Sequence, residues 1–216
     1  FRSPLFRPRT WRPTWQVQGV PDYAEVRKAQ MSGLEDYRRR LAALEPTAWP
    51  VHDQVDYLLL RSEMDDVWFE HHVLNEVETN AFYYAEQAVN GVAGSIPDVV
   101  PYGAEAARAI ITAFERTRPI LDQAYENLVL DEAAPELADA ALMHLEDIRA
   151  KYAAGVELFS PHFPESLRAD LERAAREAGD ALAAYVRWLE EHREEMKGEP
   201  HVGDEALHWF MRRVNF

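Results

Sequence analysis

Apolar residues recur every three or four positions from Leu167 to Leu189, and this unbroken period constrains the fold more than any other feature of the sequence. Such spacing places one apolar side chain per turn on a single face of an α-helix. The positions are Leu167, Leu171, Ala174, Ala178, Leu182, Tyr185 and Leu189. The pattern predicts a helix over residues 164–197, about 50 Å long, with Gly198 as its C-terminal cap.

The same period predicts further helices, and no segment alternates between apolar and polar residues as a half-buried strand does. The expected helices cover residues 22–44, a segment from 52 that is open to continuation through 84, and 104–117, 119–128, 135–158 and 204–213, with a loop over 90–103. On the second of them, one stripe holds Val55, Leu58, Leu59, Ser62, Phe69 and Val73. The sequence therefore predicts an all-α, multi-helix array with one long C-terminal helix.

Composition narrows the classes of partner. The 216 residues are 47% hydrophobic and 28% charged, a balance that supports a packed core. Acidic residues outnumber basic ones by 38 to 23, and the net charge of −15 would repel nucleic acid and anionic membrane surfaces. No apolar run is long enough to span a bilayer. The chain has no cysteine, which excludes thiol catalysis and thiolate metal sites but does not fix the compartment.

The first 20 residues differ from the rest of the chain. They carry four arginines (Arg2, Arg7, Arg9 and Arg12), two tryptophans, three prolines and no acid. Closely spaced prolines favour an extended chain. We expect residues 1–20 to form a basic arm that either binds a partner or lies across the acidic body of its own chain, and residues 21–216 to form one helical domain or domain fragment.

Few residues are arranged for chemistry. The His-Glu-x-x-His motif of zinc peptidases does not occur, and the nearest arrangement is His71, His72 and Glu76. On a continuous helix, His72 and Glu76 would share a face, either as two metal ligands or as an exposed polar patch, and two ligands do not close a zinc site. Glu205 and His208 give a single Glu-x-x-His match to the di-iron pattern. The sequence thus predicts no catalytic or metal site.

Two other groups of side chains were open to interpretation. The aromatic run Phe82, Tyr83 and Tyr84 would line a cleft or belong to the core. Adjacent carboxylates such as Asp65 with Asp66 and Glu190 with Glu191 are typical of a solvated helix face. The candidate cleft-lining residues are therefore His72, Glu76, Tyr83 and Tyr84.

Four segments, in order, resemble the bacterial family known as domain of unknown function 885. They are LEDYRRRLAALEPTAWPVHDQVDYLLLRSEMD (34–65), NEVETNAFYYAEQAV (75–89), RPILDQAYENL (118–128), and ALAAYVRWLEEH followed by VGDEALHWFMRRVNF. Trp49 and the run from Asp56 to Leu60 match a Trp and an Asp-Tyr-x-Leu-Leu segment of the family. Where the family has a Trp and a Pro before its Phe-Tyr pair, this chain has Val77 and Ala81. The resemblance covers residues 11–216.

The resemblance implies a mostly helical, zincin-like fold. It also implies a zinc-dependent peptidase or hydrolase as the parent protein, with zinc ligands C-terminal to the matched segments, so no ligand or catalytic base is carried over. On this reading the chain is a non-catalytic helical portion that forms one wall of a cleft for peptide substrates. The alternative is a free-standing helical module that binds another protein.

The end of the chain is apolar. Large apolar side chains occupy six of the last eleven positions: Leu207, Trp209, Phe210, Met211, Val214 and Phe216. Because an exposed apolar terminus promotes association, we expect this tail to dock on a C-terminal catalytic part, on a second chain or on another copy of itself.

Overall fold

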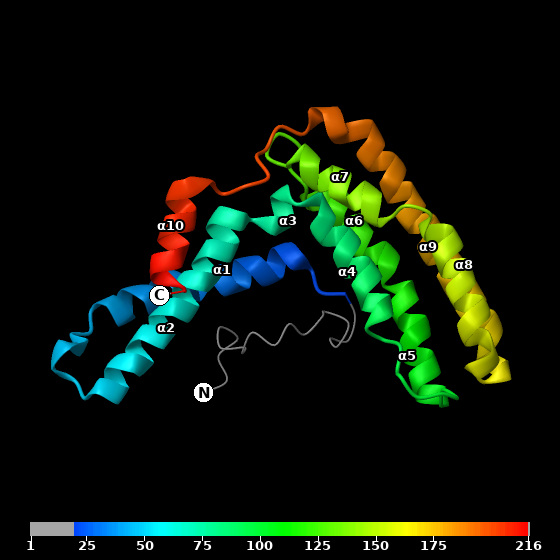
Figure 1. The fold of residues 1–216 in the computed structure, drawn as a ribbon, viewed down its shortest axis with the longest axis horizontal. Helices are drawn as coiled ribbons and strands as arrows, with labels where there is room; N and C mark the ends of the chain where they lie inside the picture. The colour runs from blue at the N-terminus through cyan, green and yellow to red at the C-terminus, as the bar shows by residue number, and fades with distance from the viewer. Residues whose placement is uncertain (1–19, 216) are drawn as a thin grey trace. The chain divides into compact units, whose positions relative to one another are not determined.

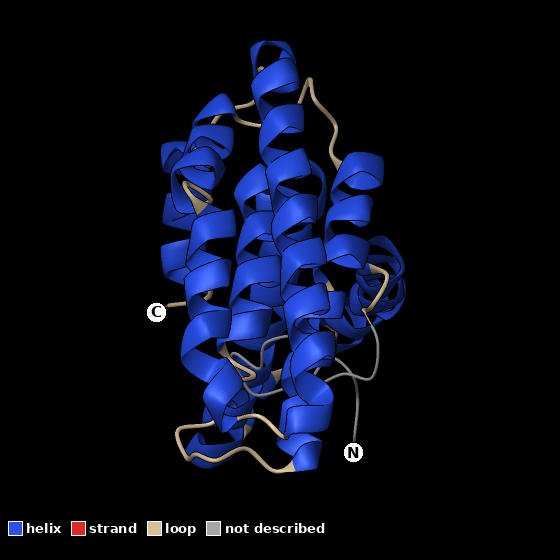
Figure 2. Cartoon of the chain, turned by 90° about the vertical axis from the view of Figure 1, so that its right-hand side faces the viewer, coloured by secondary structure: helices blue, strands red, loops and turns tan. Residues whose placement is uncertain are grey.

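The computed structural model describes residues 20–215, so all of the predicted arm except Val20 lies outside the described residues. Within this range every regular element is helical and no strand occurs (Figure 2). The α-helices are α1 (Tyr23–Ala42), α2 (Val51–Phe69), α3 (Glu76–Thr79), α4 (Ala81–Ala93), α5 (Ala104–Glu115), α6 (Thr117–Asn127), α7 (Pro135–His144), α8 (Ile148–Phe159), α9 (Arg168–His192) and α10 (Gly203–Arg213). The all-α prediction is confirmed. No described helix has both the length and the apolar character needed to cross a membrane.

The described residues divide into two compact units. Unit 1 combines Asp22–Glu76 with residues 201–215, and unit 2 contains Val77–Pro200 (Figure 1). Unit 1 is therefore discontinuous in sequence, because its last helix follows the whole of unit 2.

Unit 1 is built from α1, α2 and α10. Asp22 caps α1 by accepting a hydrogen bond from the Glu25 backbone amide across 2.9 Å. Leu34, Leu41 and Met64 form the buried centre between α1 and α2. Several half-buried side chains pack around that centre: Met31, Tyr57, Leu60, Val67 and Trp68.

Two of the predicted helices are interrupted at residues with left-handed backbone. After α2 the chain makes a π-helical turn (Glu70–Leu74) and then reaches Asn75, whose φ is 47°. Asp147, with φ 54°, separates α7 from α8. The prediction of one helix over residues 135–158 is therefore wrong, and the continuation of the second helix through Tyr84, which the sequence left open, does not occur. Asn and Asp enter this region more readily than other non-glycine residues.

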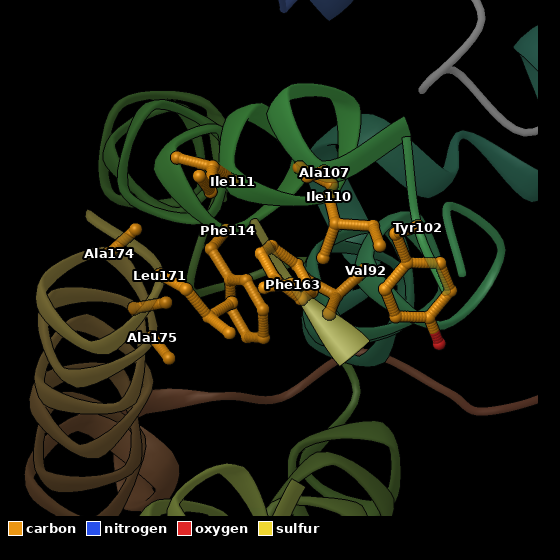
Figure 3. Packing of buried hydrophobic residues seen from close by; sticks show 12 residues of the cluster. Val92, Tyr102, Ala107, Ile110, Ile111, Phe114, Phe163, Leu171, Ala174 and Ala175 are labelled. Carbon is orange, nitrogen blue, oxygen red and sulfur yellow. The ribbon is translucent and has the colours of Figure 1, made fainter. Parts of the chain in front are cut away.

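Unit 2 packs its core between α5 and α9. Figure 3 shows side chains of α5 turned toward those of α9, with Phe163 beside them. The buried residues of this core include Val92, Tyr102, Ile110, Phe114, Phe163 and Leu171. The helix predicted over residues 164–197 is shorter, because 3-10 turns at Glu165–Leu167 and Arg193–Glu195 flank α9 and leave it about 38 Å long.

Polar contacts fix two places in unit 2. The Tyr185 hydroxyl, on α9, donates to the Ala81 carbonyl at the start of α4 across 2.8 Å. Beyond α9, the Gly198 amide donates to the Ala133 carbonyl across 2.9 Å. A Cβ at Gly198 would lie 1.9 Å from the Glu132 carbonyl oxygen, so only glycine fits this approach.

Candidate interaction surface

His72 and Glu76 do not share a helix face. His72 lies on the π-helical turn, where its ring stacks on Trp68 with centroids 4.9 Å apart and Nδ1 lies 3.1 Å from the Trp68 carbonyl. Left-handed Asn75 separates it from Glu76, which starts α3. The four-residue spacing therefore does not bring the imidazole and the carboxylate together as it would on a continuous helix.

Tyr83 and Tyr84 lie on α4 in unit 2, with ring centroids 5.3 Å apart in an edge-to-face arrangement. Tyr84 is fully buried, and its hydroxyl donates to the Val77 carbonyl across 2.7 Å and accepts from Asn127. This places Tyr84 in the core, one of the two interpretations that the sequence left open. Tyr83 is half-buried.

His71, next to the candidate His72, lies at the contact between α1 and the π-helical turn. Its half-buried ring lies with Nε2 2.8 Å from the Gln30 side-chain oxygen, and its carbonyl accepts from Arg27. Burial, followed by the positive charges of Arg27 and His72, lowers the pKa of His71 to about 4. The ring is therefore neutral near pH 7 and links α1 to the turn after α2.

No group of three or more His, Asp or Glu side chains lies in a metal-binding arrangement within residues 20–215. The Glu-x-x-His pair Glu205 and His208 lies on α10, where both side chains are exposed.

Asp65 and Asp66 are buried, which corrects the expectation that they belong to a solvated face, whereas Glu190 and Glu191 are exposed as expected. The Asp65 carboxylate, on α2, accepts from Arg38 on α1 across 2.9 Å. Its other oxygen accepts from Arg213 on α10, a helix remote in sequence. With both oxygens engaged, Asp65 serves as a structural ion-pair centre.

The tail packs on its own chain. Asp65 accepts from Arg213 across 2.8 Å, and the Phe210 and Trp209 rings lie against Phe69 at centroid distances of 4.8 and 5.9 Å. The expectation that other polypeptide covers the whole tail is wrong for these two aromatic residues.

Two apolar residues of the tail remain exposed to solvent. Leu207 and Met211 are each 50% exposed and lie four residues apart on α10. The tail therefore has one side on α2 and one exposed apolar side.

The pairings also give the direction of α10. Phe210 lies near Phe69, and the Val214 carbonyl accepts from the Ser62 hydroxyl across 2.9 Å. Later residues of α10 therefore contact earlier residues of α2, so the two helices are antiparallel. Figure 1 shows that α2 continues beyond the end of α10.

The N-terminal half of α2 carries an exposed apolar row on the side that α10 covers further along. Val51, Val55 and Leu59, which we call the α2 stripe, are 76%, 48% and 54% exposed. Their spacing of four residues aligns them along the helix, and on the same side Ser62 and Phe69 are only 8% and 4% exposed. The sequence placed Val55 and Leu59 on one stripe with these two buried residues, but α10 stops short of them.

Charge is unequal around the α2 stripe. Asp56 and Glu63, seven residues apart, lie along one edge of it, and both are exposed. No ion pair involves either side chain among the described residues. The surface is therefore an apolar row with an acidic edge.

A cavity lies in unit 2 between α8 and α9. Its volume is about 790 Å3, which suits a small molecule. The lining residues are Arg149, Ala153, Val156, Glu157, Ser160, Pro161, Arg168, Glu172, Ala175, Arg176, Gly179 and Asp180. Three arginines are thus balanced by three carboxylates, so the cavity does not select the sign of a ligand's charge.

No protein-family model, curated protein or solved structure matches this chain. The resemblance to domain of unknown function 885 therefore stays a prediction.

Proposed function

We propose that this chain is a non-catalytic helical part that works by packing against another polypeptide. The observation that carries the proposal is the α2 stripe, in which Val51, Val55 and Leu59 hold an exposed apolar row directly beyond the end of α10. Rows of apolar side chains at this spacing are the usual contact face between helices. Exposed apolar rows of this kind mark interaction sites.

The resemblance makes the catalytic portion of a zinc-dependent peptidase or hydrolase the first candidate for that polypeptide. In this proposal the zinc ligands belong to the catalytic portion, and the present chain forms one wall of its substrate cleft. Among the candidate cleft-lining residues, Tyr83 of unit 2 is half-buried, and His72 and Glu76 of unit 1 are exposed. Each is proposed, within its own unit, as a contact residue for the catalytic portion or its substrate. Peptides are the proposed substrates.

The test begins with the coding sequence downstream of codon 216. If it encodes a zinc motif, the downstream product is expressed separately, mixed with this chain, and assayed for complex formation, zinc content and hydrolysis of a fluorogenic peptide library. We expect a one-to-one complex that cleaves peptide, and no cleavage by this chain alone. Stoichiometric zinc or cleavage with this chain alone would contradict the proposal.

The alternative is a free-standing interaction module, and the same α2 stripe supports it because a helix-in-groove partner needs no catalytic portion. Two observations distinguish the two candidates. Absence of a zinc motif from the downstream coding sequence, together with binding of an unrelated protein through Val55, would favour the module.

A further inference from the structure

The α2 stripe continues an interface that the molecule already uses. Phe69 and Ser62 are covered by α10, and over the three turns of α2 before Ser62 the same side is exposed at Leu59, Val55 and Val51. The row from Val51 to Leu59 is about 12 Å long, which corresponds to two turns of a contacting helix.

The acidic edge restricts what fits there. A partner helix that placed Asp or Glu beside Asp56 and Glu63 would be repelled, whereas Lys or Arg would form ion pairs with them. A second copy of this chain, with a net charge of −15, is disfavoured for the same reason.

Resting on the proposed function, we propose that the α2 stripe is the docking site for an amphipathic helix of a separate polypeptide, with apolar residues at i, i+4 and i+8 and a basic edge. The helix lies antiparallel to α2 and in line with α10. Its N-terminal end is next to Leu59 and its C-terminal end next to Val51, since α10 approaches Ser62 in that direction.

The first test uses two labelled synthetic peptides of about 16 residues, the length at which an isolated helix begins to hold. Both carry leucine at i, i+4 and i+8, and one has a lysine edge where the other has a glutamate edge. By fluorescence anisotropy we expect the lysine peptide to bind at least about tenfold more tightly. Equal binding of the two peptides would overturn the proposed specificity.

Variants of exposed residues then locate the site. Val55→Asp is expected to weaken binding of the lysine peptide at least about tenfold. Val26→Asp is the matched control, because Val26 is 42% exposed on α1 of the same unit. An equal loss with both variants would mean that the peptide binds elsewhere. The pair Asp56→Asn and Glu63→Gln should weaken the lysine peptide and leave the glutamate peptide unchanged or tighter.

Orientation can be read from cross-linking, because the natural chain has no cysteine. Val51→Cys should form a disulfide with a peptide that carries cysteine at its C-terminal end, and Leu59→Cys with one that carries it at the N-terminal end. The reverse pattern would refute the antiparallel arrangement.

Two other occupants give distinct results. Concentration-dependent dimers that Val55→Asp abolishes would make a second copy the occupant and overturn the proposal. Peptide binding that requires removal of residues 1–19 would assign the site to that segment. If a complex with a downstream catalytic product forms and Val55→Asp leaves it intact, this inference fails while the proposed function stands.

Discussion

The guanidinium of Arg213 lies 2.8 Å from the carboxylate of Asp65, and the pair joins the last helix of the chain to the second. Because Arg38 occupies the other carboxylate oxygen, one buried acid connects α1, α2 and α10. The Asp65 side chain is 2% exposed, whereas Arg38 and Arg213 are 28% and 40% exposed.

Replacing the acid should therefore destabilise unit 1. Asp65→Asn removes the charge that both arginines face, and we expect the free energy of unfolding to fall by about 2–3 kcal/mol in urea titrations. The matched control is Asp36→Asn, since Asp36 pairs with Arg39 and is 53% exposed. It should cost less than about 0.5 kcal/mol. Similar losses for the two variants would show that Asp65 is not an ion-pair centre.

His71 should make stability depend on pH. Its folded pKa of about 4 lies below the ordinary 6.5, so the unfolded chain binds more protons between these values. The contribution is complete above about pH 6.5 and is lost as the pH falls toward 4. Because the ring is only half-buried, we expect a loss of about 1–2 kcal/mol.

The measurement compares unfolding at pH 7.0 and 4.5. His71→Gln should flatten the difference between the two pH values. His52→Gln, at a side chain that is 80% exposed, should leave it unchanged. An unaltered pH dependence in His71→Gln would place the titration on other groups.

Two glycines should respond in opposite directions to the same change. Gly198→Ala brings a Cβ against the Glu132 carbonyl and should lower the free energy of unfolding by more than about 2 kcal/mol. Gly91→Ala lies in α4 with nothing within 4 Å of the new Cβ, and should raise it by about 0.5–1 kcal/mol. Thermal unfolding followed by circular dichroism measures both. A neutral Gly198→Ala would contradict the close approach.

Attachment of α10 should depend on its inner aromatic residues. Phe210→Ala removes the ring that lies 4.8 Å from Phe69, and we expect a loss of about 2 kcal/mol and faster amide hydrogen exchange across Gly203–Arg213. Met211→Ala, at a 50% exposed position, serves as the control and should change neither. Equal exchange in the two variants would mean that α10 is held by other contacts.

The helices could be predicted from the sequence because each buries one face, so its apolar residues recur with the helical period. The interruptions at Asn75 and Asp147 could not be predicted in this way. The apolar residues on both sides of Asn75 and Asp147 keep a helical spacing, so the period gives no sign of the left-handed backbone at those two positions. The ends of α9 were overestimated because Leu167 keeps the apolar spacing within the first 3-10 turn, and at the other end no glycine or proline interrupts the chain before Gly198.

The interaction surface was hidden for a different reason. Val55 and Leu59 share a side of α2 with Ser62 and Phe69, and only the point at which α10 ends decides which of them are covered. Asp65 was read as a surface acid because its partners, Arg38 and Arg213, are far from it in sequence. One-dimensional periodicity carries no information about such long-range contacts.

The division of unit 1 into two stretches of sequence sets an order for events on the ribosome. Arg38 and Asp65 emerge early, and Arg213 follows only after the whole of unit 2 has been made, about ten seconds later at about 5–20 residues per second. During that interval the faces of Phe69 and Asp65 have no α10 to cover them. A nascent chain stalled before residue 201 should thus be a better client for chaperones than the released protein.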